Sequence, residues 1–290
     1  MNVIRPMTLL GLNLCLSLGA MTACSTQAVQ TRAHDATGNL LAQCETEFRQ
    51  GQTDRAITTA SEAIRLGPNN AATWNARGFL YASQGMLGES LEDFRNAVTL
   101  EPNGATYQSN LGVAYLESGN ASLALEAFNR ALQLEPQSAR NLKNRGLAYR
   151  KLGRAKDALK DFDSAIELSN RDATIFANRA VVYAVQQQYN EARADLDHAI
   201  RLSDSVPEVF ESRGLIEMLV GEIDRAEKDF TRALKLGASD NVLYYNRAVA
   251  RSILGDTDGS QQDYQSSCRG GYRPACGYTR VVSSTRIPSL

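Results

Sequence analysis

Residues 144–168, NRGLAYRKLGRAKDALKDFDSAIEL, contain the pattern that decides the fold. In the first half Gly146 precedes Tyr149 by three residues, and in the second half Phe162 precedes Ala165 by three. Apolar side chains three or four residues apart lie on one face of a helix. Small residues let two helices approach closely, and aromatic rings fill the space between neighbours. The stretch therefore predicts two helices packed against each other.

The same pattern recurs along the chain with a period of 34 residues. The small position of the first helix is filled by Gly78, Gly112, Gly146, Ala180, Gly214 and Ala248. The large position of the second helix is filled by Phe94, Phe128, Phe162, Leu196, Phe230 and Tyr264. The turn between the two helices favours a residue that takes positive φ cheaply, and this place holds Gly85, Gly119, Gly153, Gln187, Gly221 and Gly255. Independent positions that repeat with one period indicate a solenoid of helical hairpins.

This pattern resembles the tetratricopeptide repeat, and the resemblance covers residues 37–272 in seven units. It implies an all-α solenoid whose hairpins form a right-handed superhelix. The first unit is degenerate, because Gln43, Cys44 and Glu47 replace the usual small and aromatic residues. We interpret this unit as the N-terminal cap, and Cys44 as a small buried packing residue.

An arginine just before the small residue occurs only together with an aspartate sixteen residues later. In repeat three both charges are absent, because Leu111 and Ala127 take their places. Since the two charges are either both present or both absent in these repeats, we infer an ion pair between the two helices of each of five hairpins. We expect it to be bidentate and partly buried. The pairs are Arg77 with Asp93, Arg145 with Asp161, Arg179 with Asp195, Arg213 with Asp229 and Arg247 with Asp263. These arginines are expected to be structural, although their spacing looks like a ladder of ligand contacts.

The resemblance also implies that the first helix of each repeat lines a groove in which a protein partner binds. One groove position is an asparagine in four repeats, at Asn110, Asn144, Asn178 and Asn246. An amide side chain both donates and accepts hydrogen bonds, so such a row can hold the backbone of an extended peptide. The alternative is that these asparagines belong to the repeat subtype and face water.

Repeat four adds basic residues to this groove, at Arg140, Lys143, Arg150 and Lys151. Similar tetratricopeptide domains clamp a C-terminal carboxylate with lysines and asparagines. The full clamp is absent here, because Leu147 replaces one asparagine and Glu208 stands in place of the distal lysine. We expect a peptide-binding groove formed by Asn110, Arg140, Lys143, Asn144, Arg150, Asn178 and Asn246, which could hold an acidic side chain or chain end. A solvated basic face is the alternative.

The start of the chain has the features of an export signal. Residues 8–20, TLLGLNLCLSLGA, are apolar and uncharged, and they are shorter than the roughly 20 residues that span a membrane. The segment that ends at Cys24 resembles a lipobox, although Met21 is not the usual leucine. The resemblance implies a signal peptide over 1–23, acylation of Cys24 and a linker over 24–36. Because Ser25 is not an aspartate, it also implies the periplasmic side of a bacterial outer membrane. An ordinary cleaved signal and an uncleaved anchor are the alternatives.

Near the other end, residues 267–279, SCRGGYRPACGYT, look like the cysteine-bearing turn of Sel1-like repeats. That resemblance implies a disulfide between Cys268 and Cys276, which would fasten a C-terminal cap; free thiols are the alternative. We expect residues 273–290 to form this cap and a loose tail.

Composition excludes some classes of function. The formal net charge of the 290 residues is -1, so no global field draws the chain to nucleic acid or to anionic lipid. There is no CxxC motif, nucleophile motif or phosphate-binding loop, and the only histidines are His34 and His198. We therefore expect neither a metal nor a cofactor, and no enzymatic activity.

The function expected from these features is that of a non-catalytic protein-binding scaffold anchored by lipid. Tetratricopeptide lipoproteins of this size resemble assembly factors of type IV and Tad pili. They also resemble adaptors that recruit periplasmic proteases or cell-wall hydrolases, and the sequence does not choose between these roles. The Sel1-like end adds a lipoprotein of exopolysaccharide secretion as a further alternative.

Overall fold

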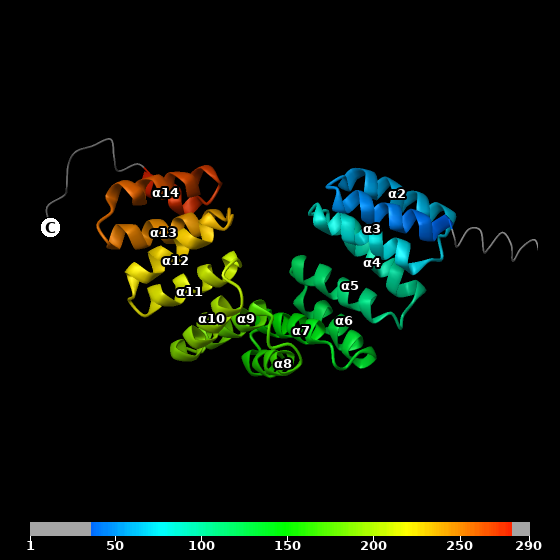
Figure 1. Cartoon of the computed structure of the whole chain (residues 1–290), viewed down its shortest axis with the longest axis horizontal. Coiled ribbons are helices and arrows are strands. Elements are labelled where there is room, and N and C mark those ends of the chain that lie inside the picture. Colours follow the sequence, from blue (N-terminus) through cyan, green and yellow to red (C-terminus); the bar gives the residue numbers. More distant parts are fainter. Residues whose placement is uncertain (1–35, 280–290) are drawn as a thin grey trace, which may run out of the picture. The chain divides into compact units, whose positions relative to one another are not determined.

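The computed structural model describes residues 36–279, and the regular elements in this part are all helices (Figure 1). The all-α hairpin fold expected from the sequence is confirmed. The expected signal peptide 1–23, the lipidation site Cys24, almost all of the linker 24–36 and the last part of the tail lie outside the described residues. Between residues 36 and 279, no helix has both the length and the apolar character needed to cross a membrane.

The helices follow one another as antiparallel pairs. A first helix, described over 36–49, pairs with α2 (Thr53–Leu66). The next pairs are α3 (Ala71–Ser83) with α4 (Leu87–Leu100), α5 (Ala105–Glu117) with α6 (Ala121–Leu134), α7 (Ala139–Lys151) with α8 (Ala155–Leu168), α9 (Ala173–Val185) with α10 (Tyr189–Leu202), α11 (Pro207–Leu219) with α12 (Ile223–Lys235) and α13 (Asn241–Ile253) with α14 (Thr257–Arg269). The short α15 (Arg273–Cys276) follows.

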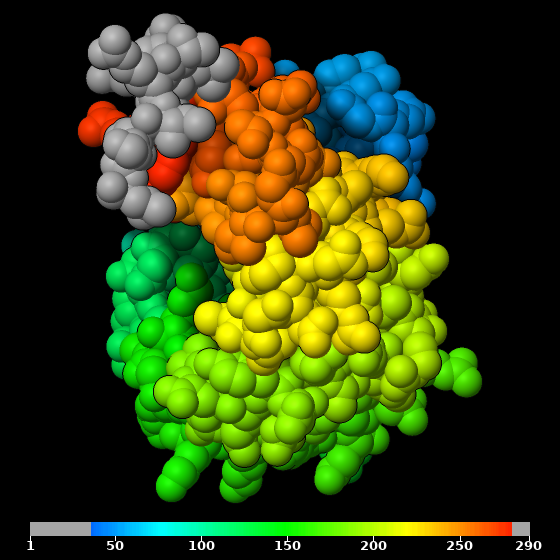
Figure 2. All heavy atoms as spheres, turned by 90° about the vertical axis from the view of Figure 1, so that its left-hand side faces the viewer, coloured from blue at the N-terminus to red at the C-terminus, as the bar shows by residue number. Residues whose placement is uncertain are grey.

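The chain divides into two compact units, Met1–Glu135 and Pro136–Leu290. In the described part of the first unit, α3 packs on both α2 and α4, and α4 packs on α5. In the second unit each hairpin packs on the next, from α7–α8 to α13–α14. Figure 2 shows this stacking for the second unit, where α11–α12 in yellow adjoin α13–α14 in orange. Within each unit a hairpin thus covers the apolar face of its neighbour, as in other repeat proteins.

The small position lets the two helices of a hairpin approach closely. A Cβ atom placed on Gly112 would lie 2.6 Å from the ring of Phe128, and one on Gly146 would lie 2.8 Å from the ring of Phe162. Both phenylalanines are completely buried. Glycine is therefore required at this position wherever a phenylalanine ring stands opposite.

The turns inside the hairpins have the backbone expected from the sequence. The six glycines at the turn position, including Gly51 of the first repeat, have φ between 71° and 86°. Gln187 occupies the same place in repeat five with φ 61°. A residue with a Cβ atom is strained in this region, so the turn between α9 and α10 is less stable than its counterparts.

The C-terminal end is closed by a disulfide and a group of tyrosines. Cys268 at the end of α14 and Cys276 in α15 form a disulfide with an S–S distance of 1.96 Å. Tyr272 and Tyr278 pack on Tyr245 of α13, with ring centroids 5.2 and 6.2 Å away. These contacts hold α15 and Tyr278 against the last hairpin.

At the other end, the degenerate first repeat has a polar group in its interior. Glu47 is buried and accepts hydrogen bonds from Gln43 and Thr59, at 2.9 and 2.7 Å. The hydrogen bond from Gln43 holds the pKa of Glu47 below its usual range. Cys44, expected to be a packing residue, is buried beside Phe48 and Leu80.

Candidate binding surfaces

The arginines and aspartates paired by the sequence argument form two-pronged ion pairs. Arg77 donates from Nε and Nη2 to the two carboxylate oxygens of Asp93, over 2.8 and 2.9 Å. The same two bonds, all of 2.7 or 2.8 Å, join Arg145 to Asp161, Arg179 to Asp195, Arg213 to Asp229 and Arg247 to Asp263. The five aspartates are buried. The hydrogen bond to Asp93 raises the pKa of Arg77. Because each guanidinium binds a buried carboxylate, these groups hold the two helices of a hairpin together.

Several of these arginines also reach the preceding repeat, a contact not expected from the sequence. Arg179 Nη1 donates to Asp163 over 2.6 Å, and Arg213 Nη1 donates to Asp197 over 2.8 Å. In the same way Arg77 donates to Ser61 and Arg247 to Thr231, over 3.1 Å each. Each partner lies sixteen residues before its arginine, just as the buried aspartate lies sixteen residues after it. One guanidinium thus joins three helices.

A further charged contact distinguishes the last repeats. At a position where four other repeats have a tyrosine, repeats six and seven have Glu217 and Arg251. The buried Glu217 is paired with Arg193 of the repeat before it, over 3.1 Å. Arg251 is paired with Glu227 of the repeat before it, over 3.0 Å. The two ion pairs therefore have opposite polarity. Between repeats five and six the earlier repeat supplies the arginine, and between repeats six and seven the earlier repeat supplies the glutamate.

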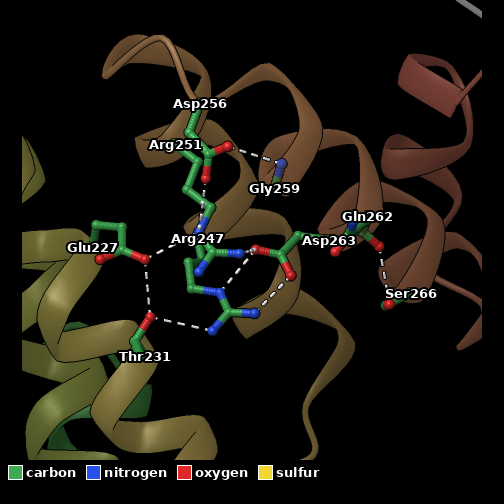
Figure 3. Close-up of polar contacts among 9 residues, drawn as sticks. All are labelled: Glu227, Thr231, Arg247, Arg251, Asp256, Gly259, Gln262, Asp263 and Ser266. Carbon is green, nitrogen blue, oxygen red and sulfur yellow. Dashed lines mark hydrogen bonds and ion pairs between the residues drawn. The ribbon is translucent and has the colours of Figure 1, made fainter. Parts of the chain in front are cut away.

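The second of these junctions is part of a larger network (Figure 3). Arg251 Nη1 also donates to Asp263 over 3.0 Å, so this carboxylate accepts from Arg247 and Arg251 together. Glu227 accepts from Arg251, and Thr231 one turn later accepts from Arg247. α12, α13 and α14 are thereby joined through one continuous set of charged hydrogen bonds.

In the first unit the groove residue Asn110 is placed beside an apolar pocket. Its Nδ2 donates to Oδ1 of Asn75 over 2.8 Å. Both asparagines line a pocket of about 330 Å³ that also includes Phe48, Phe79 and Leu80. Phe48 and Phe79 meet edge to face with ring centroids 5.4 Å apart. The amide at this place therefore lies at the edge of an apolar hollow, beside a second amide.

In the second unit the remaining asparagines do not form a uniform row. Asn144 is buried, and Asn246 is half-buried. Asn178 Nδ2 donates to the carbonyl of Thr174 in its own helix, over 2.8 Å. The hydrogen-bonding groups of this amide are thus partly used within α9, which weakens the expectation of a continuous amide ladder.

The basic residues of repeat four are only partly available. Lys143 Nζ pairs with Asp172 over 3.0 Å and donates to Thr174 over 3.0 Å, so it joins α7 to the start of α9. Burial alone would raise the pKa of Asp172, but hydrogen bonds from Thr174 and Lys143 outweigh it and lower that pKa. Lys143 therefore has a structural contact in addition to its expected place in the groove.

The other basic residues of repeat four differ in exposure. Arg150 is half-buried, and burial lowers the pKa of its guanidinium. Arg140 and Lys151, at the two ends of α7, are exposed. The basic character of this surface therefore comes mainly from the ends of the helix.

Comparison with protein families identifies the repeat. Three models, each described as tetratricopeptide repeat, match residues 41–102 and 80–139, 111–177 and 173–203. Together the matches run from residue 41 to 203, more than half of the 290 residues. The chain therefore belongs to the tetratricopeptide repeat family, whose fold is that of a protein-interaction scaffold. A comparison with curated protein sequences gives no significant match.

Solved structures agree with this fold. A tetratricopeptide repeat protein from Parabacteroides merdae ATCC 43184 is 21% identical, with a TM-score of 0.69 over 84% of this chain and 98% of the other. The APC/C hetero-tetramer Cut9–Hcn1 contains a chain that is 16% identical, with a TM-score of 0.71 over 81% of this chain and 47% of the other. The pilF protein of Pseudomonas aeruginosa is 18% identical, with a TM-score of 0.59 over 72% of this chain and 97% of the other. At these identities the likeness concerns the fold alone.

Proposed function

We propose that the protein is a non-catalytic scaffold, anchored by lipid to the periplasmic face of a bacterial outer membrane, which binds other proteins and assists the assembly of an envelope complex. The observation that carries this proposal is the use of the charged side chains. The five arginines that most resemble a ligand-binding ladder are bound to buried aspartates, so their role is to align hairpins. We infer that the side chains that stay exposed on the first helices form the surface that contacts a protein partner.

The export part of the proposal rests on the sequence before residue 36. The uncharged apolar segment 8–20 and the residues up to Cys24 support export and acylation. Stable anchoring by lipid alone requires more than one acyl chain, so the proposal implies multiple acylation at Cys24. Ser25 supports the outer membrane as the destination.

For the pathway, we propose assembly of a type IV or Tad pilus. A role as an adaptor for a periplasmic protease or a cell-wall hydrolase is the alternative. A role in exopolysaccharide secretion is a second candidate, which the bond between Cys268 and Cys276 favours because its spacing resembles that of Sel1-like repeats. The genes that neighbour this one would separate the three.

The scaffold role is tested by crosslinking in intact cells, followed by identification of the proteins attached to the full-length chain. The variant Arg140→Glu/Lys151→Glu reverses two exposed charges on α7 and leaves the Lys143–Asp172 pair in place. A matched control, Lys156→Glu/Lys160→Glu, reverses two exposed charges on α8 of the same repeat. We expect the first variant, but not the second, to lose a crosslinked partner. Absence of any crosslinked protein from the parent would reject the scaffold role.

A further inference from the structure

An apolar stripe runs across the second unit, on the last residues of three neighbouring first helices. Val185, Leu219 and Ile253 are the final residues of α9, α11 and α13, and each occupies the same register position 34 residues from the next. Their exposed fractions are 74%, 64% and 60%. Large aliphatic side chains this exposed, gathered on one surface, mark an interaction site.

The stripe is specific to repeats five, six and seven. In repeats one to four the same register position holds Arg49, Ser83, Glu117 and Lys151, all polar. The exposed Leu215 lies one turn before Leu219, and the exposed Val220 and Leu254 directly follow the stripe in repeats six and seven. The apolar surface is therefore widest on these two repeats.

The spacing of the stripe decides which kind of segment fits across it. α9 packs on α11 and α11 packs on α13, and packed helices lie about 8–10 Å apart. A helix laid across them advances 1.5 Å per residue, so side chains seven residues apart lie on one face about 10.5 Å apart. In an extended strand the side chains on one face recur about every 6.6 Å, which does not match the spacing. A helix with an apolar residue at every seventh position matches the stripe.

Acidic groups lie on the same helices as the stripe, toward the opposite ends of α11 and α13. Glu208 and Glu211 lie on α11, and Asp240 caps the start of α13. Burial, together with the Asp240 and Glu208 carboxylates, raises the pKa of Glu211. Lysine or arginine side chains that extend from a bound helix toward the starts of α11 and α13 would be attracted to these groups.

We propose that the stripe Val185–Leu219–Ile253 binds an amphipathic α-helix of a protein partner, with an apolar seam of heptad spacing and lysine or arginine on one flank. The proposal deepens the scaffold function and rests on it. It also differs from the basic groove of repeat four, which would select an acidic ligand.

The test uses the full chain and fluorescently labelled synthetic peptides of about 22 residues, long enough to span three helices. One peptide has a leucine seam at heptad spacing with lysine flanks. A second has the same seam with glutamate flanks, and a third has lysine flanks and a central proline that breaks the helix. Fluorescence anisotropy gives the dissociation constants. We expect the lysine-flanked helix to bind at least about tenfold more tightly than either of the others.

The matching protein variants are Leu219→Ser/Ile253→Ser and, as a control, Leu168→Ser, which removes a leucine of 45% exposure from the end of α8. The double variant should weaken binding by about tenfold or more, and the control should not change it. Glu208→Lys/Glu211→Lys should weaken binding of the lysine-flanked peptide and strengthen binding of the glutamate-flanked one.

Three results would overturn the proposal: unchanged affinity in Leu219→Ser/Ile253→Ser, equal binding of the proline-broken peptide, or equal binding of the two flanks. Self-association of the parent that the double variant abolishes would assign the stripe to a second copy of this chain. If cellular crosslinks persist while the peptides fail to bind, the scaffold function stands and the helix-binding stripe does not.

Discussion

The close approach of paired helices depends on a match in size between single residues. Gly146 faces Phe162, whereas at the same register Ala180 faces Leu196. We predict that Gly146→Ala lowers the free energy of unfolding by about 1–3 kcal/mol, because the added methyl meets the buried ring. With Phe162→Leu added, the loss should be smaller than the sum of the two single losses. Urea denaturation measures both, and simple additivity would contradict the prediction.

The arginine–aspartate pairs give a second prediction for single residues. Asp93→Ala leaves Arg77 half-buried without its carboxylate, which should cost about 3–5 kcal/mol. The variant Arg77→Leu/Asp93→Ala copies Leu111 and Ala127, the residues that repeat three has at these positions. We expect the double variant to recover most of the lost stability in urea denaturation. If the double variant is as unstable as Asp93→Ala, the loss of stability does not come from the unpaired charge of Arg77, and the prediction is wrong.

Among the helices and turns, the turn between α9 and α10 is the strained one. Gln187 has φ 61° where the six other repeats have glycine. We predict that Gln187→Gly raises the free energy of unfolding by about 1 kcal/mol, because glycine takes positive φ at no steric cost. The reverse change, Gly153→Gln, should cost a similar amount. Thermal denaturation followed by circular dichroism checks both, and a melting temperature unchanged in Gln187→Gly would contradict the expectation.

The C-terminal cap is an element whose stability depends on a crosslink. Cys268→Ser/Cys276→Ser should destabilise the docking of α15 on α14 by about 2–3 kcal/mol, the loop-closure entropy of so short a loop. Hydrogen exchange should rise at residues 270–279 and stay unchanged in α9. The oxidised parent treated with a reductant should behave like the double variant, and unchanged exchange in both would argue against the bond.

The hairpins and their internal contacts could be predicted because one chain contains the pattern several times. The Arg77–Asp93 type of pair was found from repeat three, where both charges are replaced. The contacts to the preceding repeat were missed because their partners differ in kind, from Ser61 to Asp163 and Thr231. The ion pair of Lys143 with Asp172 is not predictable in this way, because Asp172 lies in the loop before α9 and outside the helical pattern.

For the whole molecule, the main prediction concerns where the protein resides. If Cys24 is acylated, Cys24→Ala should move the protein from the membrane fraction to the soluble periplasmic fraction, because no acyl chain is then attached. Fractionation of cells expressing each form measures this, with Cys44→Ala as a control that leaves the lipobox intact. Retention of Cys24→Ala in the membrane fraction would contradict lipidation.

The opposite polarity of the last two junctions fixes the order in which repeats can be joined. If a recombination event removed residues 207–240, Arg193 would face Arg251, and two like charges would meet at the junction. Removal of residues 173–206 would instead set Leu159 against the buried Glu217. Either product buries an unmatched charge. Loss of repeat five or of repeat six as a whole unit is therefore expected to destabilise the second unit, although the remaining hairpins keep their own internal contacts.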